Sequence, residues 1–330
     1  MPSSQALTPS DKKILVAGSI AFDQIMTFPG FFKDHILPDK IHMINLSFLV
    51  KEFRKQRGGC AGNIGYSLAL LGETPTLVAT AGGDFQEYRD WLVEQGVDVS
   101  AVTVHEDEAT ASCFITSDQA DNQITGFFIG AMARAAELSM EAIAAERGGA
   151  DLCVVAPDDP EAMVRHCVEA RRAGIPLVFD PSFQVIAMDG ETLRKAAEGA
   201  HVVILNDYEY AVFQEKTGLD PKGLSQLADY WVVTYGEEGS EILGSDGSKV
   251  KIPAAKIHEM VDPTGAGDAF RSGFVAGMMR GVDHSVCGRM GSVAAAYVVE
   301  QYGTQSHGYT AEEFWQRYEE NFGGPLNSDG

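Results

Sequence analysis

The sequence predicts an α/β fold with a parallel β-sheet and a second, smaller β-sheet beside it. Short apolar runs alternate with helical stretches over most of the 330 residues. The clearest of these runs lie near residues 151–155, 175–180, 201–205 and 230–235. This alternation gives a parallel sheet with right-handed crossovers. Two segments, 25–48 and 109–128, interrupt it with irregular or alternating β-type sequence, and they predict one small sheet over the edge of the main sheet.

The composition indicates a globular protein with an unusual charge. Hydrophobic residues make up 45% of the chain and charged residues 22%, and the length allows one large or two medium domains. The 47 acidic side chains outnumber the 25 Lys and Arg side chains, which gives a formal net charge of −22. Because binding to nucleic acid or to an anionic membrane needs clustered cations, neither is expected as a partner.

Cysteines, histidines and the first residues indicate the cellular setting. The five cysteines are scattered and form no C-x-x-C pair, so we expect reduced core thiols and neither a disulfide framework nor a zinc site. The eight histidines show no H-x-x-x-H or H-x-H spacing, and no transition-metal site is expected. Residues 1–10 lack the apolar core of a signal peptide, and no stretch approaches membrane-spanning length. A cytoplasmic protein is therefore expected.

The first strand is predicted over Lys13–Ser19, a short apolar run closed by small residues. Loops at the carboxyl ends of parallel strands build the sites of open α/β folds, so Ser19 and Asp23 are candidate ligand contacts. The alternative is that Asp23 only ends the strand. Strand and helix alternation continues through Leu77–Thr80, Tyr88–Gln95 and Val102–Val104.

Three later turns allow both a structural and a functional interpretation. Gly58 and Gly59 open a helix that runs on to Gly72, and consecutive glycines before a helix also occur in ordinary turns. Asn206 with Glu209 three residues later forms a capping box by itself. The third turn, Val233 to Gly239 leading into Glu241, has the sequence of a glycine-containing hairpin.

The run Val261–Phe270 contains glycines and a carboxylate at a predicted helix start. Pro263 removes a backbone donor, and Gly265 and Gly267 let the main chain turn with its N–H groups exposed on one side. Asp268 then lies in the first helical turn, beside the free N–H groups and positive dipole end that would hold a phosphate. Simple helix capping is the alternative.

Two helices, 265–280 and 284–301, are predicted to close the chain. Gly273 and Gly277 would allow close packing on one face of the first helix. Three apolar side chains recur every four residues on another face: Phe270, Phe274 and Met278.

These motifs resemble those of the ribokinase-like (PfkB) family of sugar and nucleoside kinases. The run D-P-T-G-A-G-D-A-F resembles the second signature of the family, and G-G-x-x-x-N at Gly58, Gly59 and Asn63 resembles the first. N-x-x-E from Asn206 and T-x-G from Thr234 match further family motifs. A Walker A loop is excluded, because no Gly-Lys-Ser/Thr occurs in the chain.

The resemblance covers about residues 13 to 322. Runs such as G-S-I-A-F-D, R-G-G-C-A-G-N and N-D-Y-E look most like bacterial adenosine kinases, as found in mycobacteria. Ser182 follows Asp-Pro where many sugar kinases have Asn, which weakens a plain ribokinase or fructokinase assignment.

The resemblance implies a ribokinase-like three-layer α/β/α sandwich with a small β-sheet lid over the substrate site. The large nucleotide-binding and catalytic domain would comprise residues 11–24, 49–108 and 129–322. The lid would comprise residues 25–48 and 109–128.

The resemblance also implies a reaction and its residues. The γ-phosphate of ATP would pass to an alcohol, with ATP and Mg²⁺ as cofactors and a requirement for K⁺ left open. Asp268 would be the catalytic base, and the N–H groups of Gly265, Ala266 and Gly267 would hold the γ-phosphoryl oxygens. Substrate contacts would come from Ser19, Asp23, Ser47, Gly58, Gly59 and Asn63. Nucleotide contacts would come from Asn206, Thr234, Gly236, Gly239 and Thr264, and Glu209 would act indirectly on Mg²⁺.

A purine nucleoside, adenosine first, is the predicted acceptor because the lid segments contain phenylalanines. Phe114, Phe127 and Phe128 lie where the lid should face the substrate, and stacking a base on an aromatic ring is worth about 1–3 kcal/mol. Phe127 is the expected stacking residue, whereas Phe128 has the opposite strand parity and is expected in the lid's own core. Phe183 and Gln184 follow a strand end on the opposite side, and Gln184 is expected to hydrogen-bond the base edge.

Two alternatives for the function stay open. One is a sugar kinase of the same family, and the other is a catalytically silent nucleoside-binding protein on the same fold. A dinucleotide oxidoreductase is disfavoured, because no G-x-G-x-x-G follows the first strand. Exposed lid strands can pair between two chains, so a homodimer through the lid is the expected assembly.

Overall fold

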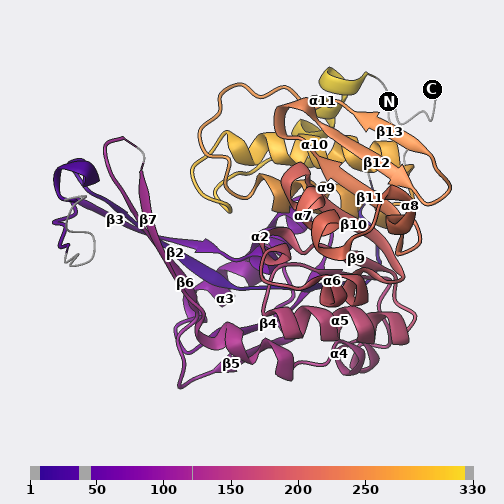
Figure 1. Cartoon of the computed structure of the whole chain (residues 1–330), viewed down its shortest axis with the longest axis horizontal. Coiled ribbons are helices and arrows are strands. Elements are labelled where there is room, and N and C mark those ends of the chain that lie inside the picture. Colours follow the sequence, from indigo (N-terminus) through magenta and orange to yellow (C-terminus); the bar gives the residue numbers. More distant parts are fainter. Residues whose placement is uncertain (1–7, 37–45, 121, 324–330) are drawn as a thin grey trace.

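The computed structural model describes residues 8–36, 46–120 and 122–323, which form two β-sheets and the helices around the larger one (Figure 1). The larger sheet has nine strands in the order β13-β12-β11-β10-β9-β8-β1-β4-β5. The strands from β11 to β5 in this order run parallel to one another, and β12 pairs antiparallel with both of its neighbours, β11 and β13. Their bounds are β1 Ile14–Ala17, β4 Pro75–Gly82, β5 Val102–His105, β8 Leu152–Val155, β9 Leu177–Phe179, β10 Ala200–Asn206, β11 Ala228–Thr234, β12 Ser240–Gly244 and β13 Lys249–Ile252.

Helices cover both faces of this sheet, because successive strand side chains point to opposite faces. In β1, Ile14 and Val16 belong to one hydrophobic core and Leu15 and Ala17 to the other. The first core is closed by α2 Cys60–Leu70, α3 Gln86–Glu94, α9 Ala266–Met279, α10 His284–Val299 and α11 Ala311–Phe322. The second is closed by α4 Met140–Glu146, α5 Pro160–Arg172, α6 Gly190–Ala197, α7 Asp207–Thr217 and α8 Pro221–Leu224. The predicted three-layer α/β/α sandwich is confirmed.

Close packing of α9 on α10 depends on two glycines, as their spacing predicts. A Cβ added to Gly273 would lie 2.5 Å from the carbonyl oxygen of Met290, and one added to Gly277 would lie 2.8 Å from Cys287 Sγ. Phe270 and Phe274 are buried on another face of α9. This packing fixes the direction of α9 and hence the position of its first turn.

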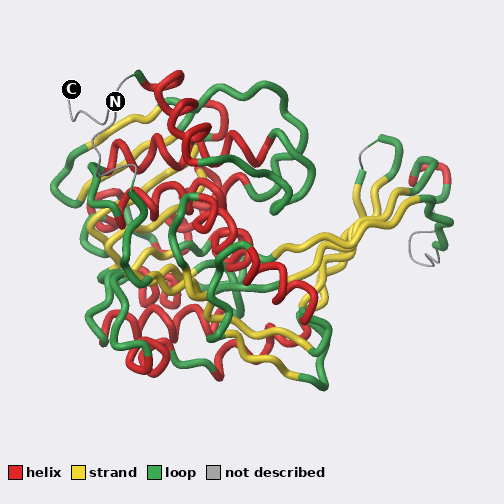
Figure 2. Tube along the Cα trace, turned by 180° about the vertical axis from the view of Figure 1, so that it is seen from behind, coloured by secondary structure: helices red, strands yellow, loops and turns green. Residues whose placement is uncertain are grey.

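The smaller sheet forms a twisted arm that extends away from the sandwich (Figure 2). Its strands, in the order β3-β2-β6-β7, are β3 Glu52–Gly58, β2 Ala21–Thr27, β6 Ala111–Ser117 and β7 Gln123–Phe128. Strand β3 lies in the stretch 49–108 that the sequence boundaries gave to the large domain. Its sequence E-F-R-K-Q-R has no apolar alternation, so the pattern did not reveal a strand. Residues 37–45 of the predicted lid segment 25–48 lie outside the described residues.

Short 3-10 helices connect several elements: η1 Phe32–Asp34, η3 Gly130–Glu137, η4 Ser182–Val185 and η5 Gly236–Glu238. All five cysteines are free thiols, as the sequence predicts. Within the described residues, no helix is both long and apolar enough to cross a membrane.

Candidate active site

The predicted site residues gather where the parallel strands end. Ser19 follows β1, Asn206 ends β10 and Thr234 ends β11, so all three lie at the carboxyl edge of the main sheet. Helix α9 begins at the same edge, and β2 of the small sheet leaves from it. Crevices at this edge bind ligands in open α/β folds.

The loop before α9 has the geometry of an anion cradle. Gly265 has φ 84°, a left-handed conformation that favours glycine, and it is the N-cap of α9. Asp262 fixes the loop, because its Oδ1 accepts from Thr264 N at 2.9 Å and its Oδ2 accepts from Gly303 N at 3.1 Å. Within the described residues, no acceptor lies against the N–H groups of Gly265 and Gly267. These groups and the positive end of the helix dipole can hold an anion.

Asp268, in the first turn of α9, is held by a hydrogen-bond network. Its Oδ2 accepts from Asn63 Nδ2 at 2.8 Å, and Asn63 Oδ1 accepts from Gln305 Nε2 at 2.7 Å. Gln305 also contacts the hydroxyl of Tyr88, which donates to the carbonyl oxygen of Gly58 at 3.0 Å. The network therefore joins α9 and α2 to the end of β3.

Burial raises the pKa of Asp268, and three neighbours oppose this effect. The largest opposing effect is the charge of Arg271, followed by hydrogen bonds from Asn63 and Cys60. A carboxylate in this environment can accept a proton more readily than one in water.

Asp23 lies on the small sheet beside the end of β3. A Cβ on Gly58 would lie 2.6 Å from Asp23 Oδ2, so only glycine leaves room for this carboxylate. Burial, together with the smaller effects of the negative charges of Asp262 and Asp268, raises the pKa of Asp23 from 3.8 to about 6. The carboxylates of Asp23, Asp262 and Asp268 thus lie close enough to influence one another.

Strand register places Phe127 on the same face of the small sheet as Asp23. Asp23 pairs with Cys113, and Cys113 pairs with Phe127. Directly paired residues point to the same side of a sheet. Phe127 is 53% exposed, so its ring is accessible on the face that Asp23 turns toward Asp268.

The other two lid phenylalanines lie on the opposite face. Phe128 pairs with Ser112, which pairs with Phe22, and Phe114 is two residues after Ser112. The opposite orientation of Phe127 and Phe128 is therefore confirmed, whereas the expectation that Phe114 faces the substrate together with Phe127 is wrong. Phe128 is also 48% exposed, so the expectation that it packs in a core of the lid is wrong as well. Strand β7 is an edge strand exposed along its whole length, which leaves it no core to enter.

Ser19 and Gly59 support the start of α2. Ser19 Oγ accepts from Cys60 N at 3.1 Å, and its carbonyl oxygen accepts from Ala61 N at 3.0 Å. Gly59 has φ 87°, and a Cβ there would lie 2.5 Å from Ser19 O. Ser47 is exposed next to Phe48, whose ring contacts Phe28 beyond the outer end of β2. The structure therefore does not bring Ser47 to Asp268.

Asn206 and Glu209 form a complete capping box at α7. Asn206 Oδ1 accepts from Glu209 N at 2.7 Å, and Glu209 Oε2 accepts from Asn206 N at 2.9 Å. Glu209 Oε1 also accepts from Ser182 Oγ at 3.2 Å. Because its charge acts on both Asp180 and Asp268, Glu209 lies close enough to influence the site.

The turn after β11 is a hairpin, the arrangement that its sequence indicates. Thr234 pairs with Ser240 of the antiparallel β12, and Tyr235 N donates to Gly239 O at 2.8 Å. A Cβ on Gly239 would lie 2.0 Å from Ile252 O, so this glycine is required by space, whereas Gly236 faces open space.

Gln184, which was expected to reach the edge of the base, is not the accessible side chain of the pair Phe183 and Gln184. Gln184 is buried, and its Nε2 donates to the carbonyl oxygen of Asp158 at 2.6 Å. Phe183 is exposed instead. The structure thus occupies the donor of Gln184 within the protein and presents the neighbouring ring.

Two charged residues of the site were missed by the sequence analysis. Arg271 of α9 forms an ion pair with Asp180, and both side chains are buried. An arginine within the apolar run A-F-R-S-G-F was the available signal, because a buried charge needs a partner. Gln305 and Tyr88 had no comparable signal.

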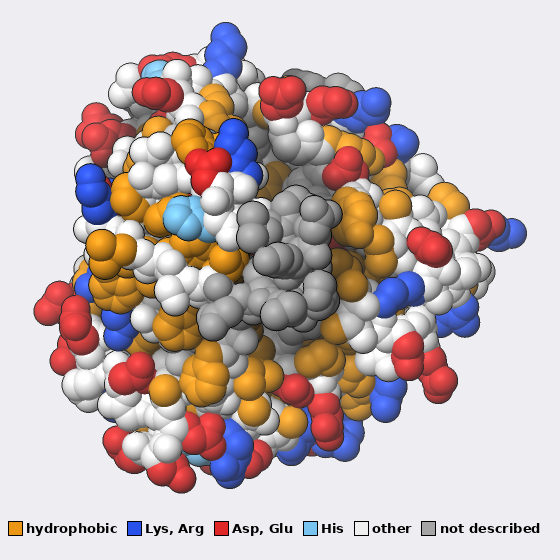
Figure 3. Space-filling model, turned by 60° about the vertical axis from the view of Figure 1, so that its left-hand side comes forward, with side chains coloured by type: hydrophobic (Ala, Val, Ile, Leu, Met, Phe, Trp, Pro, Cys, Tyr) orange, Lys and Arg blue, Asp and Glu red, His pale blue; other side chains and the backbone are white. Residues whose placement is uncertain are grey.

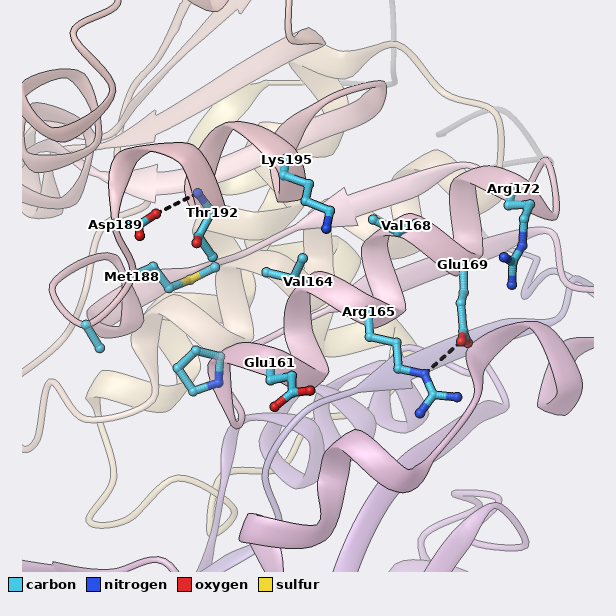
Figure 4. Close-up of a pocket in the computed structure, with 12 residues that line it drawn as sticks. Glu161, Val164, Arg165, Val168, Glu169, Arg172, Met188, Asp189, Thr192 and Lys195 are labelled. Carbon is cyan, nitrogen blue, oxygen red and sulfur yellow. Dashed lines mark hydrogen bonds and ion pairs between the residues drawn. The ribbon is translucent and has the colours of Figure 1, made fainter.

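On the side of the molecule that faces the viewer in Figure 3, hydrophobic side chains lie among acidic, basic and uncharged ones. A separate groove of about 750 Å³ runs between α5 and α6 (Figure 4). Its lining includes Glu161, Arg165 and Lys195, and it contains none of the predicted site residues. This groove is thus separate from the candidate site, which is the region between the cradle and the small sheet.

Comparisons with known proteins give consistent matches. The model of the pfkB family carbohydrate kinases matches residues 14–311. A nucleoside kinase of Methanothermobacter thermautotrophicus is 34% identical over 302 residues, 90% of this chain and 92% of the relative. The nucleoside kinase of Burkholderia thailandensis in complex with inosine is 38% identical, with 94% of this chain and 98% of that chain covered and a TM-score of 0.83. Its complex with ADP-inosine is 39% identical, with 96% and 98% covered and a TM-score of 0.82.

Proposed function

The chain belongs to the pfkB family of carbohydrate kinases, and within this family we propose that it is an ATP-dependent nucleoside kinase. It would transfer the γ-phosphate of ATP to the 5′-hydroxyl of a purine nucleoside, with adenosine as the first candidate. The observation that supports the proposal most is Asp268, oriented by Asn63 beside the N–H groups of Gly265 and Gly267, for which the described residues provide no acceptor.

Asp268 would act on the hydroxyl by position and by late proton transfer. A carboxylate is a far weaker base than an alkoxide, so it cannot remove the proton in the ground state. It can orient the hydroxyl and accept the proton as the loose transition state transfers positive character to the attacking oxygen. The hydrogen bond from Asn63 would keep the carboxylate in line for this step.

The N–H groups of Gly265 and Gly267 would hold the γ-phosphoryl oxygens. Ala266 N, the third predicted donor, donates to Pro263 O at 3.2 Å and would have to share its proton or leave that bond to join them. Such donors are fixed before the reaction, so they stabilise developing charge without reorganisation. Thr264 is exposed beside them and would contact the nucleotide phosphates together with Asn206, Thr234, Gly236 and Gly239.

Mg²⁺ would enter with the nucleotide and neutralise phosphate charge. Within the described residues, no group of three or more His, Cys, Asp or Glu side chains is arranged to hold a metal ion. The oxygen atoms of Asn206 and Glu209 are of the kind that Mg²⁺ prefers, and they fit an indirect, water-mediated role.

The acceptor pocket would lie between the cradle and the small sheet. Asp23 would accept hydrogen bonds from ribose hydroxyls, with Gly58, Gly59 and Asn63 along the same side. Phe127 supports a base-containing acceptor, because its exposed ring lies on the face of Asp23 and a free sugar offers almost no apolar surface. The relatives that are named nucleoside kinases support the same class of acceptor. Movement of the small sheet toward α9 would exclude water.

A homodimer through the small sheet is also proposed. Strand β7 is an unpaired edge, fully exposed, and such edges pair readily with a second chain. Light scattering of the purified protein tests this part separately.

The direct test is an assay of purified protein with MgATP and a panel of nucleosides and sugars, with detection of the phosphorylated product. Phosphorylation of adenosine or inosine at the 5′-position supports the proposal. Activity with free sugars alone would support the sugar kinase alternative, and binding of nucleosides without turnover would support the silent one.

A further inference from the structure

We propose that Arg271, held in place by Asp180, is a positioning residue that puts a fixed positive charge directly beneath the anion cradle. The proposal rests on the proposed phosphoryl transfer and adds a group to it. Arg271 would stabilise the charge of the phosphoryl group from inside the protein, without contacting the substrate.

The ion pair fixes the guanidinium in one orientation. Arg271 Nη2 donates to Asp180 Oδ1 at 2.6 Å, and Arg271 Nε pairs with Asp180 Oδ2. Both oxygens of Asp180 thus contact the guanidinium, one through a hydrogen bond and the other through an ion-pair contact without hydrogen-bond geometry. Asp180 is completely buried, and a planar guanidinium that is contacted at two points has little freedom to rotate.

The remaining nitrogen points at the cradle. A Cβ added to Gly267 would lie 2.4 Å from Arg271 Nη1. Gly267 is within a helix and is not among the glycines with positive φ, so its backbone does not require glycine. The space that Nη1 occupies accounts for glycine at this position. Within the described residues, Nη1 has no protein acceptor.

Three carboxylates from separate parts of the fold lie around Arg271. Asp180 precedes η4, Asp268 is on α9 and Glu209 is on α7. Burying a cation is costly unless carboxylates compensate for it, and Asp180 alone would complete a purely structural pair. Nη1 takes no part in the pair with Asp180, and it lies beside Gly267, whose N–H belongs to the cradle.

A second buried pair on the same helix is a matched control. Arg280 is the C-cap of α9, and its Nε lies 3.1 Å from Glu73 Oε1. Both side chains are as buried as those of Arg271 and Asp180. Arg280 lies at the far end of α9 from the cradle, so its loss can affect stability only.

The experiment compares Arg271→Met, Arg271→Lys and Arg280→Met with wild type, using the best acceptor from the panel. We expect Arg271→Met to lower kcat by at least about 10-fold with KM values within about 3-fold, because the charge acts in the transition state. Arg271→Lys should recover part of kcat, and Arg280→Met should lower the melting temperature while keeping kcat near wild type. Equal losses of kcat in Arg271→Met and Arg280→Met, or none in Arg271→Met, would overturn the proposal.

Arg271→Gln removes the charge but keeps a polar side chain, and it replaces Arg271→Met if that variant does not fold. A fall in kcat of about 10-fold with KM values near those of wild type supports the proposal, and wild-type kcat contradicts it. If wild type phosphorylates only a sugar, the proposed nucleoside kinase fails, while the Arg271 comparison is still made on that sugar.

Discussion

Asn63 Nδ2 donates a hydrogen bond to Asp268 Oδ2 at 2.8 Å, although 205 residues separate the two in the chain. The bond joins the glycine-rich start of α2 to the first turn of α9, the two segments that resemble the family signatures. Because Gln305 fixes the other end of the Asn63 amide, Asp268 has one defined orientation in the site.

Replacing the base tests this relationship first. Asp268→Asn is expected to fold and to bind nucleoside and nucleotide with near-normal affinity, because the amide can still accept from Asn63. Its kcat should fall by at least about 10²-fold, the scale of a lost general base. Steady-state kinetics with calorimetric binding distinguishes the two effects. Turnover near that of wild type would remove Asp268 from the role of base.

Glu209 can be tested against a second capping box in the same chain. Thr310 and Glu313 form the same reciprocal cap at α11, and neither is among the predicted site residues. Glu209→Gln should raise the Mg²⁺ concentration for half-maximal activity by about 10-fold, the scale of a lost outer-shell partner. Glu313→Gln should leave it unchanged. A lowered melting temperature in Glu209→Gln, with the Mg²⁺ dependence of wild type, would show that capping is its only role.

Asp158 gives a pH dependence of stability with a defined sign. Burial raises its pKa from 3.8 to about 8, so the folded chain holds this proton more tightly than the unfolded chain. Between these two values the folded state binds more protons, and the free energy of unfolding therefore falls as pH rises. Asp158→Asn removes this contribution, so its stability relative to wild type should increase from about pH 4 to about pH 8. Urea unfolding of both proteins at several pH values measures the difference between their free energies of unfolding. A difference that stays constant with pH would contradict the raised pKa of Asp158.

The sequence predicted the layers of the fold and the cradle because both are local patterns. Alternation of apolar runs indicates strands wherever they occur, and D-P-T-G-A-G-D contains its own turn and helix start. The hydrogen bond of Gln305 to Asn63 joins residues 242 apart, and no local pattern specifies such a contact. Strand β3 lacks apolar alternation because charged side chains occupy both faces.

The orientation of the lid phenylalanines depends on register. A shift of one residue moves a side chain to the other face of a strand, and only the pairing of Cys113 with both Asp23 and Phe127 decides which ring faces Asp268. The partnership of Arg271 with Asp180 likewise requires the packing of α9 beside β9, which sequence spacing does not encode.

The nucleoside acceptor is the central claim, and a comparison of kcat/KM for adenosine, a pyrimidine nucleoside and ribose tests it most directly. Wild type should prefer adenosine, with ribose the poorest of the three. Phe127→Ala should lower kcat/KM for adenosine by about 10-fold, as expected for the loss of one stacking contact, and change that for ribose little. Phe128→Ala, next in the strand but on the opposite face, should leave both values near wild type. A wild type that prefers ribose, or a Phe127→Ala variant that loses as much activity on ribose as on adenosine, would contradict the nucleoside assignment.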